Sequence, residues 1–484
     1  MKSLLAIIKL TCKSAVRSHI FQLLLVLLIL CIILVPNTIS GDGTAWGYIQ
    51  ISLKYSLGVI SFVLSLSTVW LGCFALTRDV ENYQIHMVIT KPVSRVTVWL
   101  GKCLGVILIN MLLLMISCGI VYFFIIWQFS RQNFSKGERS RITNEVLVGR
   151  RVYYPAMPNI GELAKAEYRK RLEAARSSGT PMPETPEQVK KTLRELRKNV
   201  IAGMAEVRFG PSASRAWEYK GLPKNLKEPL FLRYRAYIDK ISSSDQRETY
   251  GAWAVKVNIP DRELEKNKPK NIFEQQKQKE IMKSFFVPKT NYPEQIMCGV
   301  FNEFVLQPDV ISPEGTVSVA FTNIDPQGKP LFFQVSDGPK LLIKESGFFS
   351  NYCRAVFVIL LRIIILAGLA CAAGSVLSMP TAIFTVISYL LFGSFAGFLV
   401  GTEIDMPGVE FTDVMAYYVS RVLLIIIIPM QNFEMSHLIS NGELVEFSYI
   451  GRIFFQYFIL RGLPLFLIGI WLYWRREMGL VIRK

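Results

Sequence analysis

The sequence predicts an α-helical polytopic membrane protein with six transmembrane helices and an extracytoplasmic α+β insert that contains a β-sandwich. Three observations carry this prediction. The 484 residues are 51% hydrophobic, and the apolar residues collect in two blocks, at about residues 20–127 and 353–474. A strongly charged stretch lies between them. Within it, the spacing of apolar residues changes from a helical period to a period of two. This pattern excludes an ordinary cytosolic enzyme and a disordered chain.

The net charge of +18, from 55 Lys and Arg against 37 Asp and Glu, divides between these regions. Residues 131–350 hold 37 basic and 26 acidic side chains, so this stretch carries 37 − 26 = +11 and the remainder 18 − 11 = +7. A basic balance can indicate nucleic acid, an anionic membrane surface or loops that set topology. Because apolar blocks flank the charged stretch, we favour a membrane-related explanation of the positive charge and expect no nucleic-acid partner.

Cysteine and histidine usage argues against a metal site. Seven of the eight Cys lie in or beside apolar stretches, and only Cys298 belongs to the insert, which therefore has no internal disulfide. The chain has three His, namely His19, His86 and His437, and no C-x-x-C pair. We expect no metal ligands, since Cys and His clusters are lacking.

The apolar blocks divide into six spans, because a bilayer core of about 30 Å requires about 20 helical residues. Residues 1–19 are predicted as a cytoplasmic amphipathic helix, since three basic side chains recur every four residues. The first span follows at 20–35. A cleavable signal peptide is the alternative, but a convincing small-residue cleavage site is lacking. Further spans are expected at about residues 55–76, 103–127, 353–377, 382–400 and 454–474. Residues 412–429 hold too short an apolar run to cross alone and are predicted as a re-entrant or interfacial helix.

Basic loops set the predicted orientation. The N-terminus, the loop 78–102 and the tail 475–484 are basic, whereas the loop 401–451 is acidic. By the positive-inside rule, both termini are cytoplasmic and residues 128–350 lie outside. The +11 charge of this domain is no objection, because long domains translocate largely regardless of charge.

The outer domain is predicted in two parts, a helical part at 161–207 and a β-sandwich at 213–343. The segment TPEQ at 185–188 gives a helix start, and four apolar residues then share one face, namely Val189, Leu193, Leu196 and Val200. Downstream, roughly seven or eight strands alternate in polarity and are separated by turns such as SPEG at 312–315 and DPQG at 325–328. Their aromatic residues could form a binding face for carbohydrate or protein, but we favour a role in the sandwich core.

The loop RDVENYQIHMVITKPVSRVTVWLGKCLG at 78–105 is the most informative stretch. Pro92 disfavours helix at Lys91, so the chain is expected to turn there. A loop that only sets topology would explain the charges but not the order of residues. This order resembles the first cytoplasmic loop of the ABC-2 type permeases, the membrane subunits of ABC transporters. The matching residues are Glu81, Lys91, Pro92, Val93, Ser94, Arg95, Gly101, Lys102 and Gly105.

The resemblance implies a coupling helix seated in a groove of a separate ATPase subunit. It assigns the ATPase coupling to Glu81, His86, Lys91, Pro92 and Arg95. It also implies that residues 1–19 form the family's connecting helix, and that the protein works in the bacterial inner membrane as a homodimer or heterodimer. The large insert resembles that of a subset which includes relatives of the gliding and nitrous-oxide-reductase maturation permeases.

Missing motifs agree with a subunit that is not itself an enzyme. The sequence has no G-x-x-x-x-G-K-[ST], H-E-x-x-H or G-x-S-x-G, so we expect no catalytic residues and no cofactor on this chain. ATP and Mg²⁺ would bind the partner subunit. The function we expect is coupling of ATP hydrolysis to substrate export or outward conformational transmission. The alternative is a non-transporting membrane protein that presents a periplasmic β-sandwich to a partner or glycan.

Two arginines lie within predicted spans, and no acidic residue is placed deep in one. For Arg362, a functional role and snorkelling to the interface are equally favoured; for Arg461 we favour snorkelling. Two pairs of glycines, Gly101 with Gly105 and Gly393 with Gly397, permit close helix approach.

Overall fold

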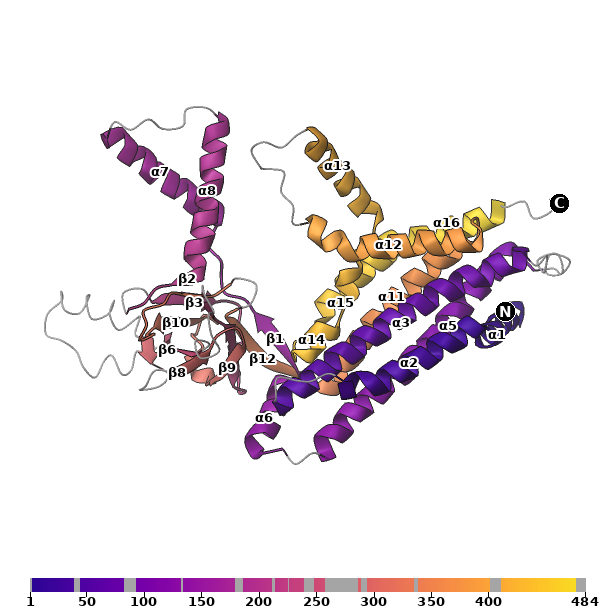
Figure 1. Ribbon diagram of the computed structural model, residues 1–484, viewed down its shortest axis with the longest axis horizontal. Helices are drawn as coiled ribbons and strands as arrows, with labels where there is room; N and C mark the ends of the chain where they lie inside the picture. Colours follow the sequence, from indigo (N-terminus) through magenta and orange to yellow (C-terminus); the bar gives the residue numbers. More distant parts are fainter. Residues whose placement is uncertain are drawn as a thin grey trace. The chain divides into compact units, whose positions relative to one another are not determined.

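The computed structural model divides into two compact units, Met1–Gly149 with Ser346–Lys484, and Arg150–Glu345 (Figure 1). We refer to them as the helical unit and the sheet unit. The structure describes residues 2–38, 44–81, 93–131, 134–178, 186–210, 214–224, 226–238, 248–256, 286–288, 294–334, 338–400 and 411–475.

The helical unit contains long apolar helices joined by short ones. In chain order they are α1 (Lys2–Val16), α2 (His19–Thr38), α3 (Ala45–Glu81), α5 (Arg95–Arg131), α6 (Lys136–Glu145), α11 (Phe348–Gly374), α12 (Met379–Val400), α13 (Phe411–Ile426), η5 (Met430–Phe433), α14 (Ser436–Ser440), α15 (Phe447–Ile453), the π-helix η6 (Phe454–Gly462) and α16 (Leu463–Arg475).

Five helical stretches among the described residues are long and apolar enough to cross a membrane: Trp46–Asp79, Arg95–Arg131, Phe348–Gly374, Met379–Ala396 and Phe447–Arg475. The pair α1 and α2, bent by 70°, passes the same criterion jointly and can supply a sixth. The described residues thus include five to six apolar helices that could span a membrane, which is compatible with the six spans that the sequence predicts. Both α3 and α5 are 37 residues long, or about 55 Å. They exceed the predicted spans because hydropathy marks only the apolar middle of a helix that continues through polar ends.

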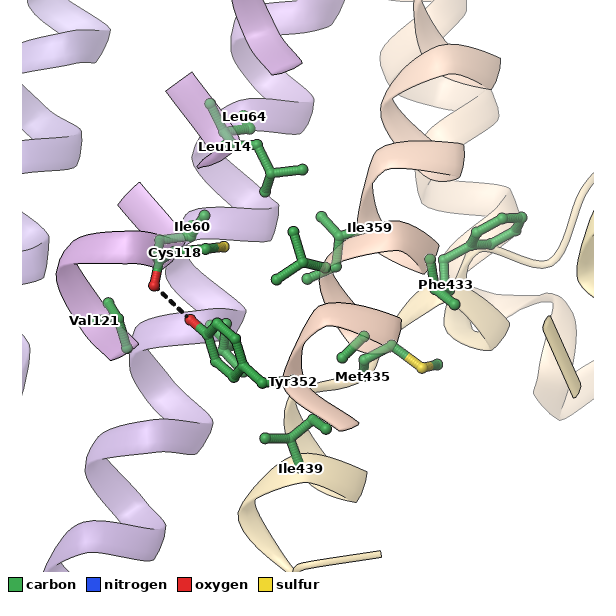
Figure 2. Packing of buried hydrophobic residues seen from close by; sticks show 14 of the residues in the cluster. Ile60, Leu64, Leu114, Cys118, Val121, Tyr352, Ile359, Phe433, Met435 and Ile439 are labelled. Carbon is green, nitrogen blue, oxygen red and sulfur yellow. Dashed lines mark hydrogen bonds between the residues drawn. The ribbon is translucent and has the colours of Figure 1, made fainter. Parts of the chain in front are cut away.

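Helices α3, α5 and α11 build the main core of the helical unit (Figure 2). Ile60 of α3, Val121 of α5 and Ile359 of α11 are at most 2% exposed. The Tyr352 hydroxyl donates to the carbonyl of Cys118 at 2.8 Å, which satisfies a polar group inside this apolar surrounding. The core also takes in Ile142 of α6, a helix that the sequence assigned to the outer domain.

Among its described residues, the sheet unit contains three sheets. The first has the order β1 (Val148–Tyr153), β12 (Lys340–Gly347), β4 (Leu230–Arg235) and β9 (Phe301–Leu306). The second has the order β3 (Arg215–Tyr219), β10 (Val317–Asn323), β6 (Glu248–Lys256) and β7 (Phe286–Pro288), with β8 (Glu294–Met297) also on β6. The third joins β2 (Glu206–Val207), β11 (Leu331–Phe332) and β5 (Tyr237–Ile238).

One aromatic core fills the space between these sheets. Trp253 of β6 is 1% exposed, and its ring centroid lies 4.8 Å from that of Tyr234 on β4 and 5.0 Å from that of Phe321 on β10. Side chains of all three sheets belong to the same core, a packing that is compatible with the predicted sandwich. Gly315 and Gly328 have φ of +75° and +66°, so the two predicted turns place glycine where the backbone is left-handed.

The helical part of the sheet unit is a pair of helices, α7 (Ile160–Ser178) and α8 (Pro186–Ala205). Helix α8 begins at the predicted proline, and Leu196 on its predicted apolar face is buried. Thr185, the predicted cap, lies outside the described residues. Strands β1 and β2 fall outside the range in which the sequence predicts strands, because neither alternates in polarity over enough residues.

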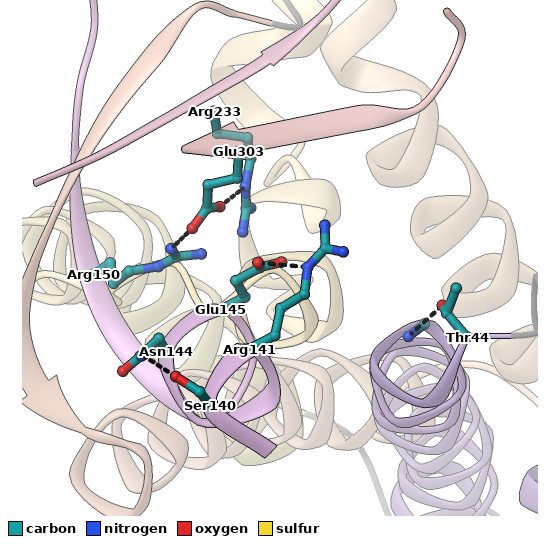
Figure 3. Close-up of polar contacts among 9 residues, drawn as sticks. Thr44, Ser140, Arg141, Asn144, Glu145, Arg150, Arg233 and Glu303 are labelled. Atoms are coloured by element: carbon teal, nitrogen blue, oxygen red, sulfur yellow. Dashed lines mark hydrogen bonds and ion pairs between the residues drawn. The ribbon is translucent and has the colours of Figure 1, made fainter. Parts of the chain in front are cut away.

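A buried ion triad joins three strands of the first sheet (Figure 3). Glu303 accepts hydrogen bonds from Arg150 Nη1 and, at 2.9 Å, from Arg233 Nε. The three side chains are at most 8% exposed. Burial alone would raise the pKa of the Glu303 carboxyl, but the charges and hydrogen bonds of both arginines outweigh burial and hold that pKa below its ordinary value.

We predict that Glu303→Gln destabilises the sheet unit by on the order of 3–5 kcal/mol, because two buried guanidinium groups lose their counter-charge. Since the folded pKa is depressed, the wild-type contribution is present above the unfolded value near 4.5 and is lost as pH falls through the folded pKa. The variant should therefore lose less stability on acidification than wild type. Thermal unfolding of the full chain at neutral and acidic pH, followed by tryptophan fluorescence, measures both effects.

The matched control is Glu314→Gln, on an exposed turn of the same unit. Equal melting temperatures for Glu303→Gln and this control would contradict a stabilising triad.

Candidate functional site

The segment 427–446, between α13 and α15, folds back into the core of the helical unit. Seven of its apolar residues are at most 7% exposed, namely Ile428, Met430, Phe433, Met435, Ile439, Leu444 and Val445. Apart from the short η5 and α14, this backbone is not helical. Non-helical backbone at membrane depth is tolerated only where protein or water satisfies its polar groups. The backbone polar groups of this segment therefore need hydrogen-bond partners elsewhere in the helical unit.

Two side chains from apolar helices satisfy the backbone where α13 ends. The Tyr389 hydroxyl of α12 accepts from the N–H of Ile428 at 2.9 Å. Arg461 Nη1 donates to the carbonyl of Ile427 at 2.9 Å. The sequence favoured snorkelling for Arg461, which stays a prediction; in the structure its guanidinium binds the carbonyl just after α13, where a cation meets the negative end of the helix dipole.

The π-helix η6 brings Arg461 to this position. The N–H of Leu463 bonds to the carbonyl of Phe458, five residues back, and Pro464, the second residue after the π-helix, has no N–H to donate. Tyr457, on the same π-helix, accepts from Asn432 Nδ2 at 2.7 Å. The widened turn thus presents two polar side chains to segment 427–446.

Asn351 of α11 holds the other end of the segment. Its Nδ2 donates to the carbonyl of Glu443 at 2.8 Å, and its Oδ1 accepts from the N–H of Val445 at 2.8 Å. The side chain is fully buried. One amide therefore satisfies a donor and an acceptor of the same backbone stretch.

An ion pair lies between these two ends. Arg362 is 14 residues, or about 21 Å, from the start of α11, and its side chain is 8% exposed. Arg362 Nη1 donates to Ser61 Oγ of α3 at 3.1 Å and lies 3.6 Å from Glu434 Oε2. Ser436 Oγ donates to Glu434 Oε1 at 2.6 Å. We refer to Arg362, Ser61, Glu434 and Ser436 as the Arg362 cluster.

Sequence reasoning identified Arg362 but missed Glu434. The residue was counted in the acidic outer loop, so no acidic group was placed at the depth of a span. One feature of the sequence could have indicated its position: Glu434 lies between Phe433 and Met435, in an apolar stretch that has few other charges. Among the described residues, no three His, Cys, Asp or Glu side chains group as metal ligands.

The predicted coupling loop is described only at its two ends. Glu81 is the last residue of α3, whereas His86, Lys91 and Pro92 lie outside the described residues. Arg95 begins α5, and its Nη1 donates to the carbonyl of Trp474 on α16 at 2.9 Å. Lys102, also on α5, forms an ion pair with Asp79 of α3. The two helices that carry the loop are thus bound to each other close to it.

Helix α1 packs against α5 at the predicted glycine pair. A Cβ added at Gly101 would lie 2.7 Å from Ile7 Cγ2, and one added at Gly105 would lie 2.7 Å from Thr11 Cβ. Cys12 Sγ also contacts the carbonyl of Gly105 at 3.5 Å. The close helix approach that these glycines permit therefore occurs between α1 and α5 of the same chain. Gly393 similarly faces the backbone of segment 427–446, with Ile428 O at 2.7 Å from its added Cβ.

We predict that Asn351→Leu lowers the melting temperature of the full chain in detergent, because Glu443 O and Val445 N–H would be buried without partners, at about 1–3 kcal/mol each. Asn351→Asp should also lower the melting temperature, since a carboxylate cannot donate a hydrogen bond to Glu443 O. Limited proteolysis should then cut within residues 430–446. The control is Asn199→Leu, at an exposed position of α8. Equal melting temperatures for control and Asn351 variants would refute this role.

The chain matches no protein-family model, no curated protein and no solved structure. The resemblance to the ABC-2 type permeases therefore rests on its loop residues and its order of apolar helices.

Proposed function

We propose that this chain is the membrane-spanning permease subunit of a bacterial ABC transporter. It couples ATP hydrolysis by a separate ATPase subunit to substrate export or outward conformational transmission. The observation that carries this proposal is the Lys102–Asp79 ion pair, because it binds α3 to α5 next to the loop that resembles a coupling helix. A force on that loop would act on both helices together.

The surroundings of the loop support force transmission. Each of α3 and α5 is about 55 Å long, which exceeds a bilayer core of about 30 Å, so both helices can extend beyond it. Helix α1 is seated on α5 at Gly101 and Gly105, and Arg95 contacts the end of α16. Four helices therefore meet at the ends of the loop.

The topology within this proposal follows from charge. Basic residues at both termini and in the loop 78–102 place these parts in the cytoplasm, and the sheet unit then lies in the periplasm. ATP and Mg²⁺ bind the ATPase, and a second permease, identical or different, completes the dimer. The sheet unit, as a β-sandwich, would receive the motion of the spans or present a surface to a partner.

We predict that full-length protein purified from membranes in mild detergent carries a P-loop ATPase, because the chain has no nucleotide-binding motif. Replacing Glu81 and His86 by Ala should reduce the recovered ATPase by about tenfold, equivalent to roughly 1.4 kcal/mol of binding. Quantitative mass spectrometry measures the recovery, and Glu314→Ala is the control. A stable, membrane-inserted chain that recovers no ATPase would refute the proposal.

We predict that Gly105→Leu weakens coupling without releasing the ATPase, because it displaces α1 and does not alter the sequence of the loop that would bind the ATPase. Stimulation of ATP hydrolysis by the chain should fall about 2- to 30-fold, the range expected for residues that transmit coupling. The matched control is Gly451→Leu on α15, where an added Cβ meets nothing within 4 Å. Equal stimulation in both variants would contradict a role for the α1–α5 contact.

A further inference from the structure

We propose that the Arg362 cluster is an anion-binding site whose ligand carries a phosphate group. The ligand competes with Glu434 for the guanidinium of Arg362. The proposal goes beyond coupling to an ATPase and does not depend on it.

Arg362 is incompletely satisfied. A guanidinium has five N–H donors, yet both contacts described above use Nη1, and Nε has no hydrogen-bond partner among the described residues. The residue is only 7% exposed. A buried donor without a partner is costly, and a buried charge more so, so the site gains free energy from any oxyanion that reaches Nε.

Glu434 is a loosely bound counter-ion. Its Oε2 lies 3.6 Å from Arg362 Nη1, which is beyond hydrogen-bond distance, and its side chain is 41% exposed. It belongs to non-helical backbone between η5 and α14. A ligand of the same charge can replace the carboxylate at Arg362 and keep the buried positive charge balanced, while Glu434 turns toward its exposed side.

The donors around Arg362 favour phosphate over carboxylate. Ser61 accepts from Arg362, so its own hydroxyl hydrogen remains available to a ligand. Ser436 donates to Glu434 and can donate to the group that replaces it. Together with Nε, these hydroxyls come from three separate segments, which suits the tetrahedral oxygens of phosphate better than a planar carboxylate.

One position of α3 beside this cluster, Gly58, has room around it. A Cβ added at Gly58, one turn before Ser61, would meet only Ser436 Oγ, at 4.0 Å. Elsewhere the surroundings are apolar, with Ile359, Phe433 and Met435 packed into the same core (Figure 2). An anion that enters beside Gly58 would therefore meet the guanidinium in a low-dielectric setting, where their attraction is strong.

The test measures the melting temperature of the purified full chain, without any ATPase, against two probes. Inorganic phosphate is added in neutral detergent, with chloride at matched ionic strength as reference. Separately, nanodiscs of phosphatidylglycerol are compared with nanodiscs of phosphatidylcholine. We expect at least one probe to raise the melting temperature of wild type by roughly 2 °C or more. A shift in melting temperature with inorganic phosphate indicates a soluble ligand, and a shift with phosphatidylglycerol alone indicates a lipid headgroup. Either shift supports the site.

Variants separate binding from a purely structural ion pair. Glu434→Gln removes the competitor and should lower the half-saturating phosphate or lipid concentration about two- to fivefold, whereas Arg362→Gln should abolish the shift. Because Arg362→Gln alone could impair folding, Gly58→Leu provides a second test, since its side chain would obstruct the approach and suppress the shift. Gly119→Leu, at an open position on α5, should retain it.

No shift in wild type with either probe beyond its reference would overturn the proposal. The proposal would also be overturned if Glu434→Gln bound the phosphate or lipid probe more weakly than wild type. A purely structural ion pair predicts such a loss of affinity, whereas removal of a competitor predicts a gain.

Discussion

Backbone polar groups inside an apolar helical core have no water to bind, and segment 427–446 places many of them there. This constraint accounts for otherwise unexplained polar residues in apolar helices. Tyr389 and Asn351 each bind backbone of the segment, and Arg461 binds the carbonyl that ends α13. The π-helix η6, which ends just before Pro464, carries Arg461 to this carbonyl. The arrangement of the final span thus depends on the segment that precedes it.

The two units compensate the desolvation cost of their buried charges in different ways. In the sheet unit, Glu303 lies between Arg150 and Arg233, and all three side chains are almost fully covered. In the helical unit, Arg362 is equally buried but Glu434 is half-exposed and only at ion-pair distance. In the triad, each carboxylate oxygen of Glu303 accepts a hydrogen bond from one arginine, an arrangement that suits a structural role. An open pair with an unused donor suits exchange of one partner for another.

Hydropathy and period were sufficient to predict apolar helices, a helical part ahead of the strands and a region of β-structure. These features depend on which residues avoid water, which a sequence records directly. The ends of α3 and α5, the position of α6 and strand β1 could not be predicted, because each depends on tertiary contacts. The partner of Arg362 was also hidden. Glu434 is 72 residues away in sequence, and only the return of segment 427–446 into the core brings them together.

Helix α3 connects the two polar sites of the helical unit. Asp79, which pairs with Lys102 beside the loop, and Ser61, which contacts Arg362, are 18 residues apart on one unbroken helix, or about 27 Å. Between them, Gly72 packs so closely on α11 that an added Cβ would lie 2.5 Å from Ala370 Cβ. Helices packed this tightly move together, because their interface has no room to deform. A displacement of α3 at the loop must therefore reach the level of Ser61, where Arg362 of α11 and Glu434 of segment 427–446 meet. Because α3 and α11 move together, any movement of this helix pair relative to segment 427–446 changes the distance between Arg362 and Glu434.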